Sequence, residues 1–128
     1  MKLLLDTHAF IWWDDDPSRL GAEALAACTN PANELLLSAA SVWEMQIKAS
    51  LGKLQIRRPL SVLIADQQQR NGLQVLPITL EHVLNLDELA THHKDPFDRL
   101  IVSTAKLESC QIVSHDRVIA RYGVSIIW

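Results

Sequence analysis

The sequence predicts an α/β fold in which a central, mostly parallel sheet is flanked by helices. Three observations lead to this prediction. Short apolar runs of strand length alternate with longer stretches of helical character, turn and capping residues separate the two, and no repeat or low-complexity tract interrupts the alternation. Continuous apolar runs are typical of parallel strands, which are buried on both faces and need right-handed helical crossovers between them.

The five expected strands are short and mostly apolar. They span residues 2–5, 35–38, 74–76, 111–114 and 124–128. The first strand is followed by Asp6, and Asp116 comes just after the fourth. Because the carboxyl ends of parallel strands meet at one edge of a sheet, we expect Asp6 and Asp116 at the edge where such sheets bind ligands.

The first two helices are bounded by capping residues and by proline. Asp6 or Thr7 is expected to cap a helix that the run Asp14–Pro17 breaks. Ser18 is expected to cap the next helix, which runs to about Cys28 before a loop at residues 30–33.

The later helices follow the same rules. Their expected spans are residues 40–51, 58–72, 79–89 and 95–109, with a short helical turn through residue 119. Gly52 and Gly72 stand where the first two of these helices should stop, because glycine adopts the left-handed conformation of a helix end. Thr79 is a suitable cap for the third.

The helix expected at residues 95–109 contains an acid whose partner is not evident from the sequence. Asp95 is a good N-cap and Pro96 suits the first helical position, where its missing N–H is not needed. Asp98 falls one turn into a helix that is otherwise apolar or small on nearly every side, so the helix should be buried. An acid at that position needs a partner, and Arg99 is the only obvious one nearby in sequence.

Size and charge limit the possible functions. The chain has 128 residues, of which 48% are hydrophobic and 21% charged, as expected for a single domain over 1–128 with one core. The net charge of -3 provides no basic surface for binding a long duplex through many phosphate contacts. A compact site that neutralises phosphate with metal ions remains compatible with this charge.

The cysteines and apolar runs indicate a cytoplasmic location. Cys28 and Cys110 are far apart and match no metal-ligand spacing, so we expect no disulfide scaffold. The run at residues 3–5 is cut off by Asp6 and is too short for the core of a secretory signal. No run approaches the roughly 18 apolar residues of a membrane span.

Four carboxylates from four separate elements are the candidate site: Asp6, Glu44, Asp98 and Asp116. At one edge of a parallel sheet they would converge, and converged carboxylates repel unless a cation neutralises them. Ligand sets made only of oxygen select hard cations, above all Mg²⁺ or Mn²⁺. Such a site can activate a water for in-line attack on a phosphodiester.

Each acid also has a purely structural interpretation. Asp6 and Asp116 fit helix or turn caps, and Asp98 fits a first-turn partner of the helix dipole. Glu44 lies four residues before Lys48, the favourable order for a surface ion pair. The coincidence of four acids at one edge favours the functional interpretation.

Histidines and tryptophans carry a weaker signal. The five histidines form no zinc-binding pattern and are interpreted mainly as surface or hydrogen-bonded core residues: His8, His82, His92, His93 and His115. His92 and His93, just before the Asp95 cap, are candidates for contact with a phosphate. The four tryptophans are interpreted as core or interface residues rather than base-stacking platforms: Trp12, Trp13, Trp43 and Trp128. Adjacent Trp12 and Trp13 cannot both face one core, so an exposed one suggests a protein partner.

Several of these segments, in this order, resemble one family. They are Leu3-Leu4-Leu5-Asp6-Thr7-His8, Ser38-Ala39-Ala40-Ser41-Val42-Trp43-Glu44, Leu51-Gly52-Lys53-Leu54, Asp95-Pro96-Phe97-Asp98-Arg99-Leu100-Ile101, Val113-Ser114-His115-Asp116 and Ile126-Ile127-Trp128. The chain resembles PIN-domain ribonucleases, especially the toxin subunits of VapBC toxin–antitoxin pairs. The resemblance covers essentially the whole length, and the segment at residues 95–101 is its most specific part.

The resemblance implies a PIN-like three-layer fold and a Mg²⁺- or Mn²⁺-dependent endoribonuclease. The family's metal-binding acids fall on the four carboxylates already singled out: Asp6, Glu44, Asp98 and Asp116. Further candidates for contact with the site are Thr7, Ser114, Asp95 and Arg99. The first two match positions where the family often has a small hydroxyl residue, and Asp95 fits the helix cap. His8 departs from the Ser or Asn common in the wider family.

The resemblance further implies partners besides RNA. Proteins of this family dimerise and are inhibited by a small cognate antitoxin, whose tail lies over the acidic site and commonly places a basic side chain there. We expect the antitoxin to dock in an exposed groove near Trp12, Trp13 and the helix at residues 40–54.

Other functions remain as alternatives. The chain is also compatible with a PIN-domain nuclease that is no toxin, or with a catalytically silent metal- or partner-binding module. A phosphoacceptor signalling domain fits poorly. It would need an acidic pair at Asp6, an aspartate at the end of a later strand where the second has Ser38, and a lysine beyond Lys106.

Overall fold

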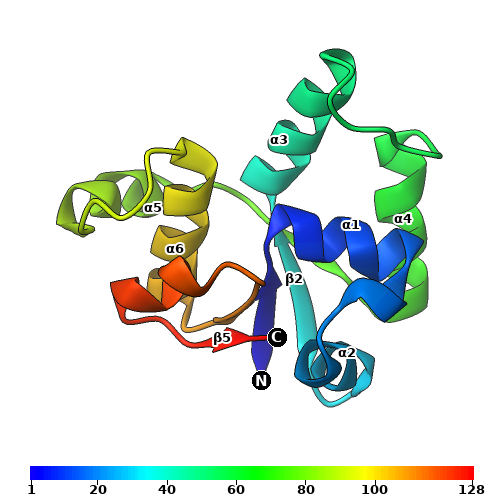
Figure 1. The fold of residues 1–128 in the computed structure, drawn as a ribbon, viewed down its shortest axis with the longest axis horizontal. Helices are drawn as coiled ribbons and strands as arrows, with labels where there is room; N and C mark the ends of the chain where they lie inside the picture. Colours follow the sequence, from blue (N-terminus) through cyan, green and yellow to red (C-terminus); the bar gives the residue numbers. More distant parts are fainter.

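The computed structural model describes residues 1–128, and its centre is one five-stranded parallel sheet (Figure 1). The strands are β1 (Lys2–Leu5), β2 (Glu34–Ser38), β3 (Gln74–Leu76), β4 (Gln111–Val113) and β5 (Ile126–Ile127). Their order across the sheet is β3-β2-β1-β4-β5, and every neighbouring pair is parallel. The predicted α/β class with a parallel sheet is therefore confirmed.

Helices cover both faces of this sheet. One face carries α1 (Thr7–Asp15), α2 (Ala22–Thr29), α3 (Ala39–Ser50) and α4 (Leu60–Asn71). On the other face lies α6 (Pro96–Glu108), with α5 (Leu80–Leu84) packed beside it. Three short 3₁₀ helices complete the chain: η1 (Pro17–Arg19), η2 (Asn85–Glu88) and η3 (Arg117–Tyr122). None of the helices has the length and hydropathy that crossing a lipid bilayer requires.

The strands supply both halves of the core, because alternate residues point to opposite faces. Leu3 and Leu5 belong to the apolar cluster beneath α1, α2 and α3, whereas Leu4 belongs to the cluster beneath α6 and η3. All three leucines have no exposed surface. Burial on both faces explains why the first strand reads as an unbroken apolar run.

The strand register places the functional edge. Leu5 of β1 lies beside Leu37 of β2 and Val113 of β4. The residues that follow these three strand positions therefore leave the sheet at the same edge. The backbone N–H of Asp6 still donates to the Val113 carbonyl at 3.1 Å, so the sheet holds the first acid in place.

Most expected helix ends agree with the structure. Asp6 caps α1 by accepting from the Ala9 amide, and Asp95 caps α6 by accepting from the Phe97 amide, each at 2.8 Å. Thr79 caps α5 in a reciprocal arrangement with His82. These caps were readable from sequence because each involves only residues within one helical turn.

The start of the second helix was predicted wrongly. Ser18 does not cap it. Its hydroxyl donates to Asp16 instead, and α2 begins at Ala22 after the short helix η1. The capping position is Gly21, where an added Cβ would lie 2.3 Å from the backbone of Trp128. The boundary therefore depends on a contact with the far end of the chain.

Ser109 generates a stability prediction. It ends α6 at φ 56°, in the left-handed region, and is the only non-glycine residue of the structure with positive φ. This conformation is unfavourable for an L-residue with a Cβ, and the residue found most often in it at a helix end is glycine. We expect Ser109→Gly to raise the free energy of unfolding by about 0.5–1 kcal/mol, as measured by urea denaturation. Ser109→Ala is the matched control and should bring no such gain; an equal gain from alanine would contradict the strain argument.

Candidate functional site

Acidic side chains from four elements gather at the carboxyl edge of the sheet. Asp6 follows β1, Asp116 follows β4, Asp98 lies in the first turn of α6, and Glu44 lies on α3. The pKa of Asp98 is raised in part by the charges of Glu44 and Asp6, and Asp116 in turn raises that of Asp6. The four carboxylates therefore share one electrostatic environment.

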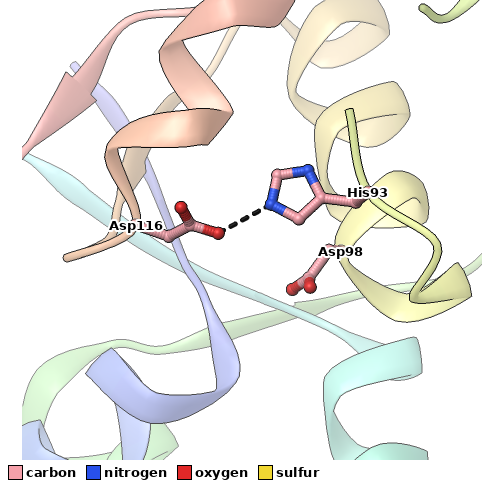
Figure 2. A group of neighbouring side chains, drawn as sticks. All are labelled: His93, Asp98 and Asp116. Carbon is pink, nitrogen blue, oxygen red and sulfur yellow. Dashed lines mark hydrogen bonds and ion pairs between the residues drawn. The ribbon is translucent and has the colours of Figure 1, made fainter. Parts of the chain in front are cut away.

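The tightest group within this edge contains two of these acids and a histidine. Ligand atoms of His93, Asp98 and Asp116 all lie within 4.8 Å of one another. Figure 2 shows the imidazole and the two carboxylates pointing toward the same space between α6 and the end of β4. Asp6 and Glu44 do not belong to this group, so the structure brings the predicted acids together unevenly.

Asp98 is the least compensated acid of the edge. It accepts no hydrogen bond from the chain, and Arg99 does not pair with it. Burial, followed by repulsion from Asp95, raises the pKa of Asp98 to about 6, although the nearby His93 works in the opposite direction. Asp98 thus has both oxygens available for a ligand from outside the chain.

Asp6 combines a structural and an electrostatic role. One carboxylate oxygen accepts from the Ala9 amide, which is the capping role expected from sequence. Burial raises the pKa of Asp6, while the Ser114 side chain and the Ala9 amide stabilise its charged form. Hydrogen bonds to the Ala9 amide and to Ser114 therefore hold the Asp6 carboxylate in place.

His93 is a hydrogen-bonded histidine, as the general interpretation of the histidines expected, but its contact with Asp116 was not predicted from the sequence. Its Nε2 lies 2.7 Å from Oδ2 of Asp116, and its Nδ1 lies 3.0 Å from the Tyr122 hydroxyl. The lowered pKa of Asp116 keeps its carboxylate an acceptor, so Nε2 must be the donor, and the neutral ring accepts at Nδ1 from the Tyr122 hydroxyl, which itself accepts from the His93 backbone N–H at 2.9 Å. Nε2 then carries the ring proton and donates it to Asp116.

This chain of hydrogen bonds controls Asp116. Burial alone would raise the pKa of the carboxyl, but the hydrogen bonds from His93 and from the Val118 amide outweigh it and lower the pKa. Asp116 therefore stays charged and oriented. His93 lies two residues before the Asp95 cap, and this position is the only feature of the sequence that indicates a place for His93 near the site.

Glu44 is buried and fully engaged within the protein. It accepts from the Thr7 hydroxyl and forms an ion pair with Lys48 at 2.9 Å. The structure therefore contains the ion pair that was the structural interpretation of Glu44. Hydrogen bonding to Glu44 raises the pKa of Lys48, which keeps the pair charged.

The remaining candidate residues divide into two groups. Thr7 contacts Glu44, Ser114 accepts from the backbone N–H of Asp116 at 3.0 Å, and Asp95 raises the pKa of Asp98. Arg99 is the exception, and its expected place beside the acids is corrected. Its guanidinium donates to the carbonyls of Leu86 and Ala90, both at 3.0 Å, and so ties α6 to the preceding loop.

The donor set fits a divalent cation. Octahedral Mg²⁺ holds its oxygen ligands at about 2.0–2.1 Å, so opposite ligands are about 4.2 Å apart. Carboxylate oxygens of Asp98 and Asp116 lie within 4.8 Å of each other, a spacing compatible with such an ion, whereas Nε2 of His93 is engaged with Asp116 and orients that carboxylate. Burial, followed by the charges of neighbouring carboxylates, raises the pKa of both Asp6 and Asp98, and a bound cation would favour their charged forms.

The adjacent tryptophans separate as expected. Trp13 is buried and its indole N–H donates to Gln67 at 3.1 Å. Trp12 is only partly buried and lines a pocket of about 220 Å³ together with Asp6 and Asp116. Trp43, 57% exposed, packs edge-on against Phe97. Of the two expected places for Trp43, core or interface, this exposure excludes the core.

Comparison with known sequences places the chain in a known group. The PIN domain family model matches residues 3–124. Ribonuclease VapC22 of Mycobacterium tuberculosis is 33% identical over 116 residues, which are 90% of this chain and 87% of that protein. Ribonuclease VapC16 of the same organism is 37% identical over 68 residues, or 50% of this chain and 47% of that protein.

Solved structures share the fold at low sequence identity. A chain of VapBC2 from Rickettsia felis, bound to a DNA fragment from its promoter, has a TM-score of 0.70 at 16% identity and matches 98% of this chain and 97% of its own. A chain of FitAcB from Neisseria gonorrhoeae has a TM-score of 0.61 at 18% identity, with 97% and 95% covered. These likenesses show a common three-layer architecture.

Asp98 generates a prediction about pH and stability in the metal-free protein. Its folded pKa of about 6 exceeds the ordinary value of 3.8, so between these values the folded chain binds more protons than the unfolded chain. This group therefore favours folding below about pH 4, and its contribution is lost as the pH rises through about 6. Asp98→Asn should stabilise the metal-free protein at pH 8 by about 2 kcal/mol after allowance for solvent screening.

Urea unfolding in EDTA at pH 4 and pH 8 measures this effect. Asp87→Asn is the control, because Asp87 is exposed and lies outside the cluster of acids. A gain for Asp98→Asn that is equal at both pH values, or no gain at pH 8, would show that Asp98 is not strained by its charge.

Proposed function

The chain belongs to the PIN-domain family, and from this premise we propose that it is a metal-dependent endoribonuclease acting as the toxin of a toxin–antitoxin pair. The observation that carries the proposal is the uncompensated Asp98 carboxylate beside Asp116 and His93, at an edge that also holds Asp6 and Glu44. The ribonuclease relatives support the reaction class, since one of them matches most of the chain.

We assign metal binding to Asp6, Glu44, Asp98 and Asp116, with Mg²⁺ or Mn²⁺ as the ion. A divalent ion would supply Lewis-acid activation of a water and charge neutralisation at the scissile phosphate. Of the four acids, Asp98 is the one that makes no hydrogen bond or ion pair with the chain, whereas Asp6 is hydrogen-bonded to the Ala9 amide and to Ser114. Glu44 differs, because Thr7 and Lys48 occupy its oxygens, and its contribution requires a change of partners or acts through its charge.

His93 and Tyr122 support the reaction without contacting RNA in this proposal. The Tyr122 hydroxyl orients the imidazole, and the imidazole donates to Oδ2 of Asp116. Because Oδ1 of Asp116 accepts from the Val118 amide at 2.9 Å, both oxygens of this carboxylate are oriented by the chain. Such support keeps a metal-binding carboxylate in position while substrate enters and product leaves.

A small antitoxin is the proposed protein partner. A groove of about 480 Å³ runs beside α1, with Phe10 and Ile11 on one wall and Met45, Leu54 and Leu60 on the other. Met45 places it beside α3, whereas Trp12 and Trp13, near which the docking groove was expected, do not line it. An apolar groove of this kind suits an amphipathic segment of a partner.

A second copy of the chain is the proposed occupant of the exposed face of α5. Leu80 and Leu84 are 72% and 62% exposed, and Val83 is 46% exposed. Their spacing along the helix places the three side chains on one face. Exposed apolar surface of this extent is typical of a protein interface.

The reaction is tested by cleavage of a mixed structured RNA with Mg²⁺, with Mn²⁺ and with EDTA. We expect cleavage by the wild type only with metal, and a loss of at least a hundredfold in Asp6→Asn and Asp98→Asn. Each variant removes a charge at nearly constant size, and Asp87→Asn is the exposed control that should retain the rate. Cleavage by Asp98→Asn at the normal rate would exclude Asp98 from the site.

The same experiment separates the alternatives. Metal-dependent cleavage with no growth arrest on expression would favour a nuclease that is no toxin. Tight Mn²⁺ binding without any turnover on a broad set of RNAs would favour the catalytically silent module.

The α5 interface yields a separate prediction. Leu84→Glu places a charge within the proposed apolar contact, so the variant should sediment as a monomer where the wild type sediments as a dimer. Val62→Glu, on the exposed side of α4, is the matched control, since Val62 is 50% exposed and lies on the opposite face of the sheet. A wild type that is monomeric at high micromolar concentration would contradict the proposed dimer.

A further inference from the structure

A small pocket adjoins the acidic edge and has no role in the chemistry described so far. Its volume is about 220 Å³, and it is lined by Asp6, His8, Trp12, His115 and Asp116. Two of these residues are acids of the candidate site, and the other three carry flat rings. The pocket therefore joins a ring-lined wall to the place where phosphate would be cleaved.

The ring-lined wall is assembled from three parts of the chain. His8 and Trp12 are four residues apart on α1 and so share one face, with ring centroids 6.1 Å apart. Trp128 packs edge-on against Trp12, with ring centroids 5.6 Å apart, and its ring is tilted by 33° to that of His115 at 5.1 Å. These contacts hold the rings in place before any ligand arrives.

The wall also presents polar groups that have no hydrogen-bond partner within the chain. The imidazoles of His8 and His115 are exposed and make no hydrogen bond within the chain, so each offers a donor and an acceptor to a ligand. The guanidinium of Arg19 lies over the Trp12 ring, 4.6 Å from its centroid, and adds a positive charge at the rim. Flat rings, free imidazoles and one cation suit a planar, polar ligand attached to a phosphate.

We propose that this pocket binds one unpaired nucleobase of the RNA next to the scissile phosphate. The base would stack on the ring of Trp12, and the imidazoles of His8 and His115 would hydrogen-bond to its edge. This inference rests on the proposed ribonuclease function and assigns His8, Trp12 and His115 as the residues that hold the nucleotide next to the cleavage site.

The size and charge of the protein support this assignment. The pocket is smaller than the 300–1,000 Å³ typical of drug-sized ligands, so it takes one ring system and excludes a paired base. Bases become available for stacking on aromatic side chains only when they are unpaired. With a net charge of -3, the chain cannot obtain its RNA affinity from many phosphate contacts, and stacking is the main sequence-tolerant alternative.

The position of the base is tested without cleavage by nuclear magnetic resonance. Protein labelled with ¹⁵N at its four tryptophans gives one indole N–H signal for each, and Trp12→Phe identifies that of Trp12. We titrate adenosine, uridine, guanosine and cytidine monophosphates with Mg²⁺ present, and ribose 5-phosphate as the ligand that lacks a base. The Trp12 signal should shift with at least one nucleotide and stay in place with ribose 5-phosphate.

Variants of the ring-lined wall extend the test to affinity. Trp12→Ala should weaken binding of the preferred nucleotide about tenfold, and Trp12→Phe should restore most of it, because an aromatic face is retained. Trp43→Ala is the matched control, an exposed tryptophan beside Glu44 that lies outside the pocket, and it should leave the Trp12 shift unchanged. Equal shifts with nucleotides and ribose 5-phosphate, or nucleotide shifts confined to Trp43, would overturn the proposal.

Kinetics on RNA separate this inference from the proposed function. In Trp12→Ala, KM for a single-stranded substrate should rise about tenfold. The fall in kcat should be smaller than this rise in KM. If the wild type cleaves RNA and Trp12→Ala has the same KM as the wild type, the proposed nuclease function is retained and the base pocket is rejected. A nucleotide-dependent Trp12 shift without any RNA cleavage would keep the pocket as a nucleotide site and reject the nuclease.

Discussion

The parallel pairing of β1 with both β2 and β4 is the constraint on which the rest of the structure depends. It sets Leu5 beside Leu37 and Val113, so three chain segments leave the sheet at one edge. The backbone pairing continues one residue further, since Asp6 donates to Val113 and Ser114 donates to Ile127. The backbone of Asp6 and Ser114 therefore extends the hydrogen-bond ladder, which fixes where these two chain segments leave the sheet.

Local hydrogen bonds give the acids of this edge different roles. Asp6 and Asp116 each use one oxygen to cap the helix that follows, so they are structural and functional at once. Asp95 takes over the capping of α6, which leaves Asp98 free of structural duty. An acid without a partner in a partly buried position is costly, and it is at such positions that functional chemistry is usually found. Asp98, which has no structural hydrogen bond, is therefore the acid whose charge the chain leaves without a partner.

The surroundings of the edge suggest how an acidic protein can act on an acidic polymer. A bound cation would offset the repulsion between carboxylates and phosphate at the centre. At one side, rings of His8, Trp12 and His115 offer binding energy that does not depend on net charge. The apolar groove beside α1 lies elsewhere and is lined by a separate set of residues. The two cavities are lined by different residues of α1, Phe10, Ile11, Asp14 and Asp15 in the groove and His8 and Trp12 in the pocket, so the proposed substrate and protein partner need not compete for the same side chains.

The sequence alone determined the α/β class, the order of the elements and most helix ends, because apolar periodicity and capping are local properties. It also determined which acids reach the carboxyl edge, since that follows from their places after strands and in first turns. Only the tertiary structure decided what each side chain meets there. His93 reaches Asp116 across 23 residues of sequence, and Thr7 reaches Glu44 across 37. Gly21 replaces Ser18 at the start of α2 because Trp128 packs against it. Such contacts depend on how distant elements pack, and no pattern within one segment contains that information.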